Sequence, residues 1–357
     1  MHCKRAAVGL LSLSCVLSAL PASADEQESG AKPGAKPGGT FTVGAGFGSL
    51  EGFVGYAGVG HGRLFGVDGL RLHLDTRLSA HRFDAGMGLE VAPRGSRLFL
   101  GLGAYHSHRE LDGLVEGDET GGWLKLGLRL SDGWRLAAGS RVAHVTREDL
   151  FAPEGLEERR LLSAPFLELS RRATRLDPSG LPLGLDLEAR VEHASRYTGA
   201  DFSYTKLDLT MSRGVSLPAG LVLQLQGHAG LIAGPDIPLF HRYRLGHPLA
   251  GESALPRLGS DVMTPGGLMN LGGTGILHGK MALYLPIVRG HLYAMGGLEA
   301  GGLVAPSHLS AAAAGVLGLY WNSPIGPLSA GVSLPITAPP DGGKRTPGFI
   351  LGIGGRF

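Results

Sequence analysis

Two histidines are the first residues in this sequence that could do chemistry. His106 and His108 lie two positions apart in the run YHSHRE. Alternate residues of a β-strand point to the same face, so these imidazoles could bind a metal ion together with a third ligand. The alternative is a polar strand end at the mouth of a loop. The other histidines are scattered, and we expect neither a metal site nor a cofactor.

A hydrolytic set could be assembled from Ser140, His144 and Asp149. Polar residues of any barrel supply such a set, however, and no Gly-x-Ser-x-Gly elbow accompanies it. The row Asp186, Glu188, Arg190 and Glu192 places charges on alternate positions of one segment. This pattern is more typical of a solvated lumen wall than of a catalytic pair. We therefore expect that the protein is not an enzyme.

The composition restricts the elements that could carry these residues. The chain has 357 residues, of which 43% are hydrophobic, 18% are charged and 60 are glycine. A packed α/β domain has little use for so many glycines, because each loses extra backbone entropy on folding. Collagen would need a strict three-residue period, which is absent. After the N-terminal leader, no segment has the 18 or more apolar residues of a membrane helix.

Residues 1–24 are typical of a secretory signal peptide, with Lys4 and Arg5 before an apolar core and Ala22-Ser23-Ala24 at the cleavage site. Lipoprotein processing at Cys15 is the alternative. Residues 25–39 repeat GAKPG and predict a flexible linker rich in glycine and proline. Without the two basic leader residues, 33 basic residues become 31, against 31 acidic ones. We expect no nucleic-acid partner.

The rest of the chain alternates between apolar and polar residues. In the window 124–130, leucines occupy every second position, and Lys125, Gly127 and Arg129 lie between them. This period of two predicts strands with one apolar face. About sixteen strands are predicted, at 40–48, 51–60, 67–79, 83–92, 96–109, 122–131, 134–146, 160–172, 181–194, 203–214, 219–232, 276–287, 290–302, 310–324, 326–336 and 347–357.

A soluble β-sandwich would alternate in a similar way. Here, however, the leader directs the chain out of the cytoplasm, and the polar faces mix charges with glycine, as a barrel lumen does. The chain also ends on the aromatic residue Phe357, as terminal strands of outer-membrane barrels do. We therefore predict an all-β fold, in which residues 40–357 form a transmembrane antiparallel β-barrel of about sixteen strands in the bacterial outer membrane and contact its lipid. The candidates for aromatic girdles are Trp123, Trp134, Trp321 and Tyr320.

The C-terminal third resembles a known family. The segments GVLGLYWNSPIGPLSAGVSLPI (315–336) and GFILGIGGRF (348–357) resemble the penultimate hairpin and final strand of BamA/TamA-type outer-membrane assembly factors, the bacterial surface antigen superfamily. NLGGTGILHGKMALYLPI (270–287) is similar to the strand after the family's long loop. The glycine pattern of 40–66 is similar to its first hairpin. The resemblance covers most of 40–357 and is most specific at 315–336.

This resemblance implies a barrel whose first and last strands meet at a loosely paired seam. The alternative for the glycines near the seam is that they only relieve crowding in the lumen. The implied seam residues are Gly44, Gly46, Gly48 and Phe357, and the implied family hairpin comprises Trp321, Ser323, Pro324, Gly326 and Pro327.

The long segment 233–275 would correspond to a family loop that folds into the lumen. Ala250 then stands where the family has an arginine, and Ala294 stands where it has the acidic partner. Loss of both is physically reasonable, because a single buried charge without its partner is more costly. Arg242, Arg244 or Glu252 could substitute. The implied lumenal loop residues are Arg244, Gly246, Leu249, Ala250, Gly251 and Glu252.

The family usually carries soluble periplasmic repeats before the barrel, and the predicted linker is too short to hold one. The resemblance implies a role in the assembly, insertion or translocation of outer-membrane proteins. Its partners would be other outer-membrane proteins as clients, or separate periplasmic subunits. The alternative is a passive pore or a structural barrel subunit that has lost insertase activity.

Overall fold

The structure is a computed structural model that describes residues 39–48, 52–61, 69–79, 82–93, 95–111, 115–131, 133–149, 157–173, 175–177, 180–238, 241–243, 273–305, 308–323, 326–337 and 347–353. The predicted signal peptide and all of the predicted linker except Gly39 lie outside these residues. None of the helices in the described ranges is long and apolar enough to cross a membrane.

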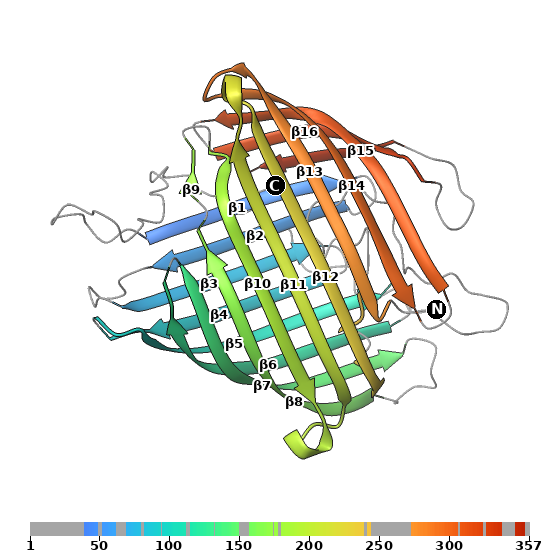
Figure 1. Ribbon diagram of the computed structural model, residues 1–357. Coiled ribbons are helices and arrows are strands. Elements are labelled where there is room, and N and C mark those ends of the chain that lie inside the picture. Colours follow the sequence, from blue (N-terminus) through green and yellow to red (C-terminus); the bar gives the residue numbers. More distant parts are fainter. Residues whose placement is uncertain are drawn as a thin grey trace, which may run out of the picture.

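Strands dominate the described residues, together with two single-turn 3-10 helices (Figure 1). The elements are β1 (Gly39–Gly48), β2 (Gly52–His61), β3 (Leu70–Ser79), β4 (Arg82–Val91), β5 (Leu98–Leu111), β6 (Val115–Arg129), β7 (Trp134–Asp149), β8 (Glu157–Arg172), β9 (Arg175–Leu176), β10 (Pro182–Ala194), η2 (Arg196–Thr198), β11 (Ser203–Ser216), η3 (Pro218–Gly220), β12 (Val222–Asp236), β13 (Gly275–Val288), β14 (Leu292–Ala305), β15 (His308–Ser323), β16 (Gly326–Pro335) and β17 (Gly348–Ile353).

Each long strand pairs antiparallel with the next long strand along the chain. The two-residue β9 pairs only with the start of β10, so β8 pairs directly with β10. β1 pairs with β2 over ten residue pairs and with β17 over four, so the ladder returns to its first strand. Figure 1 shows these tilted strands arranged around a common axis, with β10–β12 in front of β3–β8. The predicted all-β antiparallel barrel is confirmed.

The two faces of the strands differ in chemistry. On β6 the side chains of Leu124 and Leu126 are 56% and 57% exposed, while Gly127 and Glu119 on the opposite face are buried. Exposed leucines recur at alternate positions of β5, β11, β13 and β15. A water-soluble surface would not present such a continuous apolar band, whereas a lipid-facing barrel must. The apolar face therefore points outward and the polar face lines the lumen.

Side chains fill much of the lumen on the β7–β15 side. Because directly paired residues of neighbouring strands share a face, the buried residues of these strands all point inward. They form one apolar cluster that includes Leu162, Phe202, Tyr204, Ile232, Tyr284 and Tyr320. The turn before β10 adds the buried Leu181 to this cluster. The lumen is thus a packed interior on this side.

Most predicted strands lie within a few residues of the observed ones, but β6 begins seven residues before its predicted start. Asp118, Glu119 and several glycines interrupt the apolar alternation there. Cross-strand pairing with β5 and β7 nevertheless continues back to Val115. The prediction failed because backbone hydrogen bonds to long neighbours do not depend on side-chain polarity.

Two of the four proposed girdle aromatics do not face lipid. Trp321 is 47% exposed on the outer face of β15, and Trp134 lies beside Arg171, whose Cζ is 5.6 Å from the ring centroid. In contrast, Trp123 faces the lumen and stacks on His73, and Tyr320 is buried among other tyrosines. Both residues occupy strand positions that face the lumen, so their rings lie inside the barrel.

Candidate functional site in the barrel lumen

The long connection between β12 and β13 begins and ends against the lumen wall. Of its residues, 237–238, 241–243 and 273–274 are described. The backbones of Tyr243 and Gly273 exchange two hydrogen bonds, of 2.9 and 2.8 Å. The two ends of the connection are therefore joined to each other as a short ladder. The predicted lumenal loop residues Arg244, Gly246, Leu249, Ala250, Gly251 and Glu252 lie outside the described residues.

His241 attaches the start of this connection to a distant strand of the wall, β6. Its Nε2 lies 2.9 Å from Oε2 of Glu119 on β6, and both side chains are buried. The imidazole also packs edge-on against Tyr204, with ring centroids 5.6 Å apart. Because β7, β8, β10 and β11 lie between β6 and β12 in the sheet, this contact joins two parts of the lumen wall that are not neighbours.

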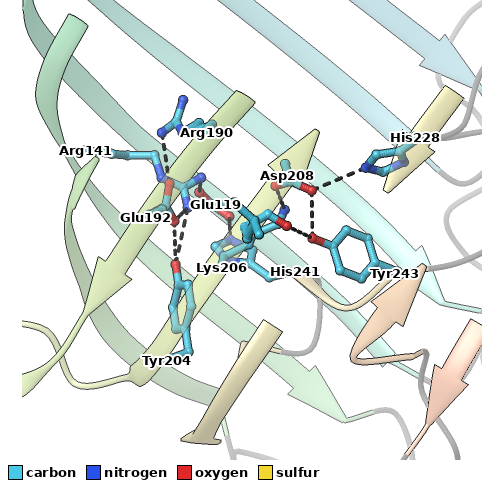
Figure 2. Close-up of polar contacts among 11 residues, drawn as sticks. Glu119, Arg141, Arg190, Glu192, Tyr204, Lys206, Asp208, His228, His241 and Tyr243 are labelled. Atoms are coloured by element: carbon cyan, nitrogen blue, oxygen red, sulfur yellow. Dashed lines mark hydrogen bonds and ion pairs between the residues drawn. The ribbon is translucent and has the colours of Figure 1, made fainter. Parts of the chain in front are cut away.

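Glu119 belongs to a continuous chain of ion pairs (Figure 2). Arg141 on β7 donates from Nη1 to Glu119 at 3.1 Å and from Nη2 to Glu192 at 2.5 Å. Tyr204 donates to Glu192 at 2.6 Å, and Arg190 donates to the other oxygen of this carboxylate at 2.9 Å. Every charge in this chain has a charged partner, as a buried network requires.

Tyr243 makes the second attachment. Its hydroxyl donates to Asp208 Oδ1 at 2.7 Å, and it also lies 3.1 Å from the carbonyl oxygen of Leu207. Lys206 and His228 contact the same carboxylate at 3.0 and 3.3 Å. Gly230 makes room for the ring, because a Cβ at this position would lie 2.3 Å from the Tyr243 hydroxyl oxygen.

Burial shifts the titration of both loop residues. It lowers the pKa of His241, although the nearby Glu119 carboxylate acts in the opposite direction. Burial, together with the hydrogen bond to Asp208, raises the pKa of Tyr243. His241 is therefore neutral near pH 7 and donates from Nε2. Its buried Nδ1 has no hydrogen-bond partner among the described residues.

This arrangement is suited to holding a loop in place. Within the described ranges, no group of three or more histidine, cysteine or acidic residues could hold a metal ion. The network instead joins β6, β7, β10 and β11 to the start of the connection, at His241 and Tyr243. We call Glu119, Arg141, Glu192, Tyr204, Asp208, His241 and Tyr243 the loop-docking network.

The residues first considered for chemistry lie elsewhere. His106 and His108 point outward from β5, and His108 Nδ1 lies 2.9 Å from Asp118 Oδ1. Ser140 and His144 share the outer face of β7 but are four residues apart, or about 13 Å at ~3.3 Å per residue. The structure therefore does not bring the serine and the histidine together, and the side chain of Asp149 lies outside the described residues.

The charged row on β10 does line the lumen. Arg190 and Glu192 pair with each other at 2.9 Å and belong to the network just described. Asp186 and Glu188 precede them on the same face, opposite Arg172 and Ser170 of β8. These charged residues line the lumen and pair with neighbouring side chains, as the alternation of the sequence indicated.

The predicted seam glycines lie on β1. Gly46 and Gly48 are opposite Gly352 and Ile350 of β17, whereas Gly44 pairs only with β2 in the described residues. Phe357 lies outside those residues. A loose seam therefore stays a prediction.

The family hairpin forms the β15–β16 connection. Trp321 pairs with Leu328, and Ser323 pairs with Gly326. Pro327 is opposite Asn322, and Pro324 lies outside the described residues. Its family-specific role stays a prediction.

The inference from Ala294 was wrong. This residue is opposite Leu285 and Leu319, which are both exposed on the outer face of the barrel. The lumenal acid on the same strand is Glu299, which is 1% exposed and accepts a hydrogen bond of 2.7 Å from His278. The sequence comparison placed the family's acidic residue at a position of β14 that faces lipid, because an error of one residue along a strand exchanges its two faces.

Sequence reasoning missed most of the loop-docking network. Glu119 precedes the predicted start of its strand, and His241 and Tyr243 precede Arg244, the first of the implied lumenal loop residues. Charged residues at inward positions of long strands were the available signal. Without the register, however, no pattern could pair residues separated by 122 positions.

A lipid-facing apolar exterior, a charged lumen and a connection attached to the lumen wall at His241 and Tyr243 define this protein as an outer-membrane β-barrel. Residues 94–357, which make up most of the chain, match the Omp85 superfamily domain. The chain therefore belongs to the Omp85 superfamily, and its location is the bacterial outer membrane. Among curated proteins, none matches the sequence.

Solved structures share this fold at low sequence identity. A form of BamA from Haemophilus ducreyi lacking POTRA domains 1-3 superposes with a TM-score of 0.69 and 14% identity, covering 89% of this chain and 70% of that one. CdiB from Escherichia coli gives 0.57 and 14%, covering 88% and 62%. CdiB from Acinetobacter baumannii gives 0.55 and 14%, covering 88% and 59%.

Proposed function

We propose that this barrel handles other polypeptides in the outer membrane, either by inserting outer-membrane proteins or by translocating a protein across the membrane. The observation that carries the proposal is the docking of the long connection through His241 and Tyr243. A passive pore has no need to attach the start of so long a connection to its lumen wall by two separate polar contacts.

Membership of the Omp85 superfamily supports the same proposal. BamA and CdiB are the relatives in fold, and their activities are carried over to this chain only as part of the proposal. The implied partners are outer-membrane proteins as clients, or separate periplasmic subunits. The seam between β1 and β17 and the docked connection would be the parts that act on a client.

Depletion of the protein tests the proposal. We expect the amounts of one or more other outer-membrane or surface proteins to fall when the protein is depleted, as measured by quantitative proteomics of isolated outer membranes. Wild-type protein should restore them. Unchanged levels of all such proteins would contradict the proposal.

A pair of variants links this activity to the docked connection. Tyr243→Phe removes the hydrogen bond to Asp208 and should restore client levels only in part. Tyr320→Phe changes a buried tyrosine that lies in the same lumen but far from the connection, and it should restore them fully. Equal restoration by both variants would separate the activity from loop docking.

The second candidate is a passive pore or a structural barrel subunit. It is favoured by Ala250, which on the sequence comparison replaces the family's loop arginine. Planar-bilayer recordings distinguish the two candidates. A large, steady conductance would favour the pore, whereas small and irregular currents would fit a lumen that is narrowed by the apolar cluster and by the docked residues His241 and Tyr243.

A further inference from the structure

A second charged cluster lies in the lumen, at the end of the barrel opposite the long connection. Arg129 on β6 and Arg135 on β7 are directly opposite each other in the strand register. Like charges in this position destabilise a sheet. Both contact one carboxylate, because Arg129 Nη2 lies 3.0 Å from Glu90 Oε1 and Arg135 Nη1 lies 3.4 Å from Glu90 Oε2.

Further positive charge surrounds this pair. Arg71 is directly opposite Glu90 on the neighbouring strand, and the charges of Arg71 and Arg172 both act on Arg135. The second carboxylate beside the cluster is Asp186, which is opposite Arg172. Among these six groups, the positive charges exceed the negative charges by two.

Neighbouring charged groups do not remove this excess. Lys125 and Glu168 pair with each other at 3.1 Å and are balanced. Glu188 lies two strands away from Arg135, with Ser170 between them. The cluster is therefore locally electropositive.

The two central arginines are held in place and are partly exposed to the lumen. Phe99, which is almost fully buried, lies beneath Arg135 with 6.0 Å between the guanidinium carbon and the ring centroid. The side chains of Arg129 and Arg135 are 24% and 25% exposed, so solvent in the lumen reaches them. Arg129 Nε is buried and has no hydrogen-bond partner among the described residues.

We propose that this cluster binds a doubly charged phosphate-type oxyanion, with Arg129 and Arg135 as donors and Arg71 and Arg172 as additional positive charges. Guanidinium groups present paired N–H donors in the geometry that phosphate oxygens accept. A dianion also matches the excess charge, and it removes the repulsion between the two opposed arginines. The phosphate group could belong to a free solute or to a lipid headgroup. The site shares no residue with the loop-docking network.

Titration of the refolded barrel with inorganic pyrophosphate tests the site. We use isothermal titration calorimetry in phosphate-free, zwitterionic detergent at low ionic strength. Arg129→Gln should weaken binding at least tenfold, because a charge-assisted hydrogen bond is lost. Glu90→Gln should strengthen binding, because it removes a competing carboxylate. A merely structural cluster would not give these opposite signs.

A matched control separates the lumen from the outer surface. Arg171 lies at the same end of the barrel but on the outer face, beside Trp134. Arg171→Gln should change the affinity less than twofold. Folding of each variant is checked by its heat-dependent mobility on gels, and Arg135→Gln replaces Arg129→Gln if the latter does not fold.

Three results would overturn the proposal: no binding of pyrophosphate by the wild-type barrel, equal losses in Arg129→Gln and Arg171→Gln, or weaker binding in Glu90→Gln. Nanodiscs identify the source of the phosphate. Equal affinity in phosphatidylcholine and phosphatidylglycerol discs supports a site for a free oxyanion. Weaker pyrophosphate binding in the phosphatidylglycerol discs than in the phosphatidylcholine discs supports a site for a lipid headgroup, provided that this difference between the discs disappears in Arg129→Gln.

Discussion

Replacing Gly230 by alanine should release Tyr243 from the lumen wall. The added Cβ would lie 2.3 Å from the Tyr243 hydroxyl oxygen and 2.4 Å from Cζ, so the ring must move. Movement breaks the hydrogen bond to Asp208, which is worth about 1.5–3 kcal/mol for a charged acceptor. It also loses the edge-on contact with His228, whose ring centroid lies 5.7 Å from that of Tyr243, worth about 0.5–1.5 kcal/mol. Docking of this segment should therefore weaken by about 2–4 kcal/mol.

Hydrogen exchange of the barrel in nanodiscs measures this effect. Each 1.4 kcal/mol changes an equilibrium tenfold, so the amides of Tyr243 and Gly273 should open about 30 to 1,000 times more often in Gly230→Ala. Gly227→Ala is the matched control on the same strand, because its Cβ would meet only the His278 carbonyl oxygen at 3.9 Å. Unchanged protection in Gly230→Ala, or equal loosening in both variants, would refute the assignment of Tyr243 as an anchor.

Three further outcomes follow from the structure. Glu119→Gln removes the carboxylate shared by Tyr105, Arg141 and His241, and it should lower the free energy of unfolding in urea by about 3–5 kcal/mol; a loss below about 1 kcal/mol would mean that water replaces the carboxylate. Because burial lowers the pKa of His241, the undocked segment takes up a proton first, so docking should be strongest above a pH of about 6.5 and weaken as the pH falls. Hydrogen exchange corrected for its intrinsic pH dependence measures this change, and His241→Gln should remove it. Leu126→Arg on the outer face should reduce stability in vesicles by about 2–4 kcal/mol, whereas Leu309→Arg near a strand end should cost about 0–1 kcal/mol; equal effects would contradict the membrane placement of the β6 face.

The fold could largely be predicted from the sequence, because every strand of a barrel repeats the same alternation of apolar and polar residues. Leu124, Leu126 and Leu128 alternate with polar residues, and alternation alone assigns them to one face. Strand limits were less accessible where side chains did not alternate. β6 extends back past Glu119 because its neighbours continue to pair with it, and this information lies in other strands.

The candidate site was much less accessible. Alternation predicted that the row on β10 lines the lumen, and the ion pair between Arg190 and Glu192 lies there. The partner of Glu192 across β8, Arg141, could not be found without the register. The assignment of Ala294 failed for the same reason, since a shift of one residue exchanges the lipid face and the lumen face.

Some properties were therefore determined by the sequence itself: the all-β class, the outward apolar face, and the resemblance of the penultimate hairpin and the final strand to a known family. These depend on local periodicity and on short contiguous motifs. The tertiary structure alone decided which charges meet. His241 contacts Glu119, and Arg129 is opposite Arg135 beside Glu90. Both contacts arise because strand pairing and register bring residues that are far apart in the sequence close together on the lumen face.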